Sequence, residues 1–136
     1  MIKALFTHLN YMKVKRTLFL FGFVIFQLVI VSSVQANQAQ VVDVKISALG
    51  NQQYRIDTTL SHSDTGWKHY ANAWFVYDKS GRLLGERVLH HPHVDEQPFT
   101  RSLTLKIPST IKEIVIKAQD SIHGLNEQGK TVQVPN

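Results

Sequence analysis

The feature that most constrains this chain is a period-two alternation of apolar and polar residues that recurs between residues 42 and 134. Residues 42–46 alternate strictly, and the alternation resumes over residues 54–60 after the turn pair Gly50-Asn51. Successive side chains of a strand point to opposite faces, so this pattern predicts half-buried strands. Further strands are predicted over residues 73–77, 83–89, 99–107, 114–119 and 131–134.

Short strands separated by turn signals indicate an all-β fold. No window of useful length has the 3.6-residue period of an amphipathic helix. The pattern predicts an immunoglobulin-like antiparallel β-sandwich of about seven strands, with a small barrel as the alternative. Trp74 is predicted to fill a core position on the third strand. The chain has no cysteine, so an exported domain of this kind must rest on its apolar core.

The first 36 residues have the order of a secretory signal. Basic residues without acids occupy residues 1–16, an apolar run covers residues 17–31, and Val34 and Ala36 suit a peptidase site. We therefore expect a signal peptide over residues 1–36 and a β-sandwich domain over residues 37–136, located in the periplasm or secreted, with no membrane span after cleavage. An uncleaved anchor is the alternative, and Met12 is an alternative start.

The charge balance excludes one class of partner. Four of the 15 Lys and Arg residues lie in residues 1–16, which leaves 11 against all 10 Asp and Glu residues in the remainder. The predicted mature chain therefore carries a charge near +1 and has no basic cluster. A nucleic-acid-binding domain requires a basic face, so we expect no nucleic-acid partner.

Histidine is confined to three segments of the predicted domain. The segments are residues 62–70, 90–98 and 121–129, and they contain or border all six histidines of residues 37–136. With seven antiparallel strands, alternate connections lie at the same end of the sandwich. We therefore expect these three segments to meet at one end, and the turns near residues 50, 80 and 109 to occupy the other.

The motif His90-His91-Pro92-His93 is the strongest local indication of metal binding. In extended chain the side chains of His91 and His93 point the same way, and Pro92 favours extended geometry. The predicted ligands are His91 and His93, together with His69, His90 or His123. Asp95, Glu96 and Asp120 are expected to accept hydrogen bonds from the ring N–H groups. Imidazole without thiolate or thioether favours Zn²⁺ or Cu²⁺. In the alternative, these histidines only shape the loop and cap backbone groups.

The same loops also fit a metal-free interaction module. Trp67 and Tyr70 stand in a polar segment and are candidate anchors for a protein or glycan partner. Glu96 and Arg101 are expected to form an ion pair, and in the alternative Arg101 binds an anion. Asp120 is a further candidate binding residue. No catalytic residues are predicted, because triad residue types adjacent in sequence do not make triad geometry, so an enzyme is the least favoured function.

Three motifs carry a resemblance that covers most of the predicted domain. They are GWKHYA at residues 66–71, HHPHVDEQPFTR at residues 90–101 and DSIHG at residues 120–124. The pattern resembles a group of small exported bacterial proteins of unassigned function, which implies a single secreted β domain. The chain also shows a faint similarity to the immunoglobulin-like iron domain of superoxide reductases, which binds iron through histidines and one cysteine. This chain lacks that cysteine.

Overall fold

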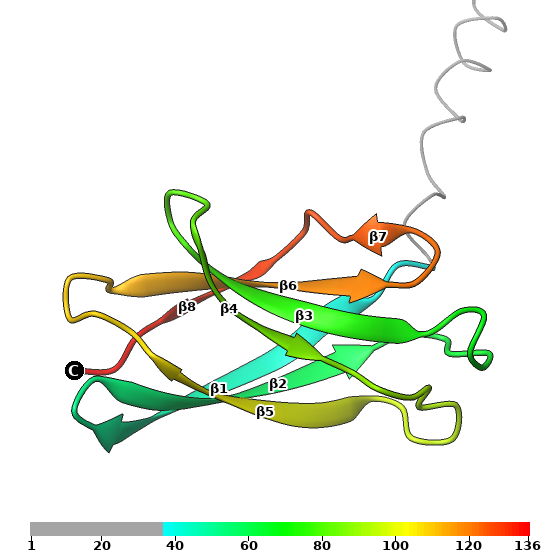
Figure 1. Ribbon diagram of the computed structural model, residues 1–136, viewed down its shortest axis with the longest axis horizontal. Coiled ribbons are helices and arrows are strands. Elements are labelled where there is room, and N and C mark those ends of the chain that lie inside the picture. Colours follow the sequence, from blue (N-terminus) through cyan, green and yellow to red (C-terminus); the bar gives the residue numbers. More distant parts are fainter. Residues whose placement is uncertain (1–36) are drawn as a thin grey trace, which may run out of the picture. The chain divides into compact units, whose positions relative to one another are not determined.

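Two antiparallel sheets make up the computed structural model, which describes residues 37–136 (Figure 1). The first sheet has the order β1-β2-β5, and the second has the order β4-β3-β6-β7, with β8 also paired to β6. The strands are β1 (Gln40–Gly50), β2 (Gln53–Ser61), β3 (Ala71–Asp78), β4 (Leu83–Val88), β5 (Phe99–Lys106), β6 (Glu113–Asp120), β7 (Gly124–Leu125) and β8 (Lys130–Gln133). The predicted all-β, antiparallel sandwich is confirmed.

The core lies between the sheets and follows from the alternation in the sequence. On β2, Tyr54, Ile56, Thr58 and Leu60 are buried, while the intervening side chains are half-buried or exposed. The third strand contributes Trp74, which is fully buried as predicted. All buried core residues of the described chain lie between Ala39 and Val134, so residues 37–136 contain their own hydrophobic core.

The strand boundaries match the alternation closely, with one addition. Strand β7 has only two residues and lies inside the segment predicted to be a loop, residues 121–129. It pairs with the end of β6, whereas β8 pairs with the beginning of the same strand. Both are short, and a pair of residues is too brief for an alternation to be visible.

The three histidine-bearing connections lie at one end of the sandwich, as expected (Figure 1). The backbone N–H of His93, between β4 and β5, donates to the Asp64 carboxylate between β2 and β3. The ring of His123, after β6, lies 5.1 Å from the ring of His69, measured between centroids. We call this region the histidine end. Residues 51–52, 79–82 and 107–112 form the opposite connections.

The predicted signal peptide, residues 1–36, lies outside the described residues. Within residues 37–136, no helix has the length and apolar character needed to cross a bilayer.

Candidate metal centre at the histidine end

His62 and Asp64 extend the inward-facing series of β2 beyond the end of that strand. The two side chains are almost fully buried, at 1% and 0% exposure. One carboxylate oxygen of Asp64 accepts a hydrogen bond from His62 Nδ1 at 2.6 Å and another from the Ala71 N–H at 3.0 Å. The other oxygen accepts from the His93 N–H at 2.7 Å. Asp64 therefore fixes the His62 ring and joins two of the three loops.

The second ring nitrogen of His62 faces an oxygen that can only accept. Its Nε2 lies 3.0 Å from the carbonyl oxygen of Asn37. A neutral imidazole has one N–H donor and one lone pair. With Nδ1–H donating to Asp64, a neutral ring leaves a lone pair at Nε2 next to the Asn37 oxygen, and a cation bound by both atoms would offset the repulsion between them. A carboxylate behind a histidine is the usual support of a metal-ligating ring.

Asp120 stands at the end of β6 and is 1% exposed. Its Oδ1 accepts hydrogen bonds from the backbone N–H groups of Ile122, at 2.9 Å, and His123, at 2.7 Å, and from His123 Nδ1, at 3.0 Å. Burial raises the pKa of this carboxyl, but the hydrogen bonds from His123 and Ile122 together outweigh it and lower the pKa below its ordinary value. Asp120 therefore presents a buried negative charge.

His69 brings an unpartnered nitrogen to this carboxylate. Its Nε2 is buried and 3.4 Å from Asp120 Oδ1, yet it makes no hydrogen bond within the described residues. The His69 ring lies between the rings of His62, with a centroid distance of 4.7 Å, and His123. A buried polar atom without a partner is costly, and a bound ion is one of the few features that account for it.

One ligand atom each from His62, His69 and Asp120 lie within 4.8 Å of one another. Donors around a zinc ion with bonds of about 2.1 Å stand roughly 3 to 4 Å apart. Small side-chain rotations would therefore bring the three donors to bonding distance of one ion. We call His62, His69 and Asp120 the metal triad. Among the described residues, it is the one group of three potential ligands that meets this criterion.

His91 and His93 lie in a neighbouring part of the histidine end, outside the metal triad. The His93 ring is stacked on Phe99, with centroids 3.7 Å apart and planes 9° apart, and the His91 ring packs beside it at 4.6 Å. Neither ring nitrogen of His93 makes a hydrogen bond to a described residue. Burial, followed by the nearby charges of Arg101 and His91, lowers the pKa of His93. The two rings expected to be the central ligands thus lie side by side, as expected from the sequence, but they are not part of the group formed by His62, His69 and Asp120.

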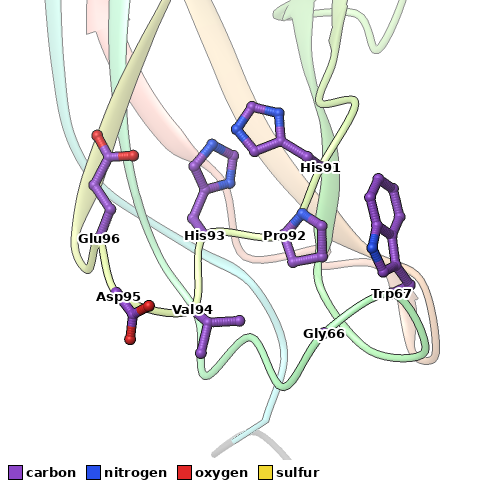
Figure 2. Close-up of a pocket in the computed structure, with 8 residues that line it drawn as sticks. All are labelled: Gly66, Trp67, His91, Pro92, His93, Val94, Asp95 and Glu96. Atoms are coloured by element: carbon purple, nitrogen blue, oxygen red, sulfur yellow. The ribbon is translucent and has the colours of Figure 1, made fainter.

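A hollow of about 550 Å³ opens beside this pair (Figure 2). Its lining residues are Gly66, Trp67, His91, Pro92, His93, Val94, Asp95 and Glu96. Trp67 is 68% exposed and contacts Tyr70 edge-on, with centroids 6.0 Å apart. His90 is exposed and stands outside both groups. The expected Glu96–Arg101 ion pair is present, with Arg101 Nη2 2.9 Å from the Glu96 carboxylate.

Asp120 is expected from the sequence to support the ligands, and its carboxylate lies within 4.8 Å of ligand atoms of His62 and His69. His62 as a ligand and Asp64 as the supporting carboxylate were not predicted from the sequence. A signal for both existed, because the buried positions of β2 recur at every second residue from Tyr54 to Leu60 and continue through His62 and Asp64. Two polar residues that continue an inward-facing apolar series point into the domain and must find partners there.

Comparison with known proteins gives two findings and one negative result. The chain is 36% identical over 101 residues to a protein of Halomicrobium mukohataei named "Putative lipoprotein". The match covers 74% of this chain and 50% of the relative. The chain therefore spans about half the length of that relative. The superoxide reductase (1Fe-SOR) from Giardia intestinalis is 16% identical, with a TM-score of 0.43, over 67% of this chain and 95% of that one. No family model matches the chain.

Proposed function

We propose that this protein is an exported domain that binds one divalent transition-metal ion at the metal triad, His62, His69 and Asp120. The observation that carries the proposal is the buried His69 Nε2, which has no hydrogen-bond partner among residues 37–136 and lies 3.4 Å from the Asp120 carboxylate. His62 adds a second nitrogen that faces an acceptor and is oriented by Asp64 from behind. His123, whose Nδ1 contacts Asp120, stands beside the group as a further potential ligand.

The donor set selects the class of ion. Two imidazoles and one carboxylate suit Zn²⁺, Cu²⁺ and Fe²⁺, whereas soft ions prefer thiolate and thioether ligands. Residues 37–136 contain neither cysteine nor methionine. Zn²⁺ and Cu²⁺ are therefore the first ions to test, and Cu²⁺ is expected to bind more tightly because of the Irving–Williams order.

Calorimetric titration of residues 37–136 with Zn²⁺ tests the proposal. We expect one ion per domain with a Kd below about 10 μM, which corresponds to about −7 kcal/mol. Asp120→Asn removes the charge but keeps an oxygen for the backbone N–H groups, and we expect it to weaken binding at least tenfold. His69→Ala should abolish binding, whereas the exposed control His90→Ala should leave it unchanged. A wild-type domain without saturable binding would refute the proposal.

Export rests on the predicted signal peptide and on the lipoprotein name of the Halomicrobium mukohataei relative. Location in the periplasm or outside the cell is part of the same proposal. Expression of the full chain in a bacterial host, followed by cell fractionation and mass measurement, tests it. We expect the protein outside the cytoplasm with Asn37 as its first residue. Full-length protein in the cytoplasm would contradict export.

A second candidate function is recognition of a protein or glycan, and it is favoured by one observation. Trp67 is 68% exposed at the edge of the hollow that His91 and His93 line. A large exposed aromatic side chain beside a concavity is typical of a recognition surface. Trp67→Ala should leave Zn²⁺ affinity unchanged, so the two functions can be separated by this variant.

A further inference from the structure

We infer that Asn37 is a ligand of the same metal ion, through its carbonyl oxygen and, once the preceding peptide bond is cleaved, through its α-amino nitrogen. The inference rests on the proposed function and deepens it, because it makes removal of the leader the step that completes the metal site. The residues concerned are 37–40, which lead into β1 at the histidine end.

The contact between His62 and Asn37 is the first argument. His62 Nε2 and the Asn37 carbonyl oxygen are 3.0 Å apart, and Asp64 takes the only N–H of a neutral His62 ring. Two neighbouring ligands of an ion with bonds of about 2.1 Å stand about 3 Å apart in octahedral geometry and about 3.4 Å apart in tetrahedral geometry. The separation therefore matches two donors that share one cation.

The segment is held next to Asp120 by two hydrogen bonds of the Ala39 backbone, and Ala39 is fully buried. The Ala39 N–H points to Asp120 Oδ2, at 3.4 Å, and the Ala39 carbonyl oxygen accepts a hydrogen bond from Asn126 Nδ2 at 3.0 Å. Asn126 is itself buried. The segment therefore reaches both His62, which follows β2 of one sheet, and Asp120, which ends β6 of the other sheet.

Covalent geometry places the nitrogen of Asn37 close to its carbonyl oxygen. Within one residue the nitrogen and the carbonyl oxygen are separated by about 3 Å, and together they can close a five-membered ring around a metal. In a peptide bond the nitrogen lone pair is delocalised and the nitrogen keeps its proton, so it is a much weaker metal ligand than an amine. Hydrolysis of the Ala36–Asn37 bond consumes one water, leaves a carboxylate on Ala36 and gives Asn37 an amine. Cleavage at the site predicted from the sequence therefore creates a new donor beside His62.

The test compares three forms of the domain by calorimetric titration with Zn²⁺. The first begins at Asn37 with a free amine, the second has the same amine acetylated, and the third retains Gln35-Ala36 before Asn37. The free-amine form is expected to bind at least tenfold more tightly than either blocked form. Equal urea midpoints of the three forms in the presence of chelator establish that the modifications leave the fold intact.

The outcomes separate this inference from the proposed function. If all three forms bind Zn²⁺ equally and His69→Ala abolishes binding in each, the role of the Asn37 amine is refuted while the metal triad stands. If no form binds, both are refuted. A tenfold or greater loss in both blocked forms, together with loss in His69→Ala, supports the inference.

Discussion

Replacing Asp64 tests whether one buried carboxylate holds the histidine end together. Asp64→Ala removes the acceptor of three hydrogen bonds, those donated by His62 Nδ1 and by the backbone N–H groups of Ala71 and His93. A hydrogen bond to a charged group contributes about 1.5 to 3 kcal/mol. Because such losses are partly offset by relaxation and water entry, we expect the free energy of unfolding to fall by about 3 to 5 kcal/mol.

Urea unfolding in the presence of a chelator measures this loss without a contribution from bound metal. With a slope of about 1.5 kcal/mol per molar urea, the midpoint should fall by about 2 to 3 M. Asp95→Ala is the matched control, because Asp95 is an exposed carboxylate of the β4–β5 loop. Asp64→Asn keeps one acceptor oxygen and serves as a milder variant, with an expected loss of about 1 to 3 kcal/mol. A loss below about 1 kcal/mol in Asp64→Ala would refute the reasoning.

Three further variants test packing at the histidine end and within the sheets. The pKa of His93 is lowered on folding, so the unfolded chain takes up the proton first and the free energy of unfolding falls as the pH drops below about 6.5. His93→Phe should therefore flatten the dependence of stability on pH between pH 7 and 5. An unchanged slope in this variant would contradict the prediction. A Cβ at Gly129 would lie 2.6 Å from Val115 Cγ1 and 2.9 Å from the Ile116 carbonyl oxygen. Gly129→Ala should therefore lower the free energy of unfolding by about 1 to 3 kcal/mol, measured by urea unfolding. Gln128→Ala, at the exposed neighbouring position, is the control and should change it little. Ile116→Ala empties a fully buried position and should cost about 2 to 5 kcal/mol by the same assay, with a smaller cost arguing that the core collapses around the gap.

The strands could be predicted from the sequence because the alternation reports directly which side chains face inward. The buried positions of β2 and β6 recur at every second residue. The shared location of the three histidine-bearing loops followed from strand count alone, since each added antiparallel strand returns the chain to the opposite end. Neither inference needs a distance between residues remote in sequence.

The membership of the metal triad does require such distances. His62 and Asp120 follow and end strands of different sheets, and their approach depends on how those sheets pack. His91 and His93 looked like a ligand pair because they are near each other in sequence. The sequence does not show that Phe99, at the start of β5, takes up one face of the His93 ring. The position of the His93 ring is therefore set by a tertiary contact, and this contact separates it from the metal triad.

The two ends of the described chain lie at opposite poles of the sandwich (Figure 1). Asn37 contacts His62, whereas the carbonyl oxygen of Pro135 accepts a hydrogen bond from the hydroxyl of Tyr54, at the beginning of β2. A fluorophore, affinity tag or surface linker placed after Asn136 would therefore sit far from the histidine end. The same addition placed before Asn37 would crowd them, so immobilised or labelled forms of this protein should be built through the carboxyl terminus.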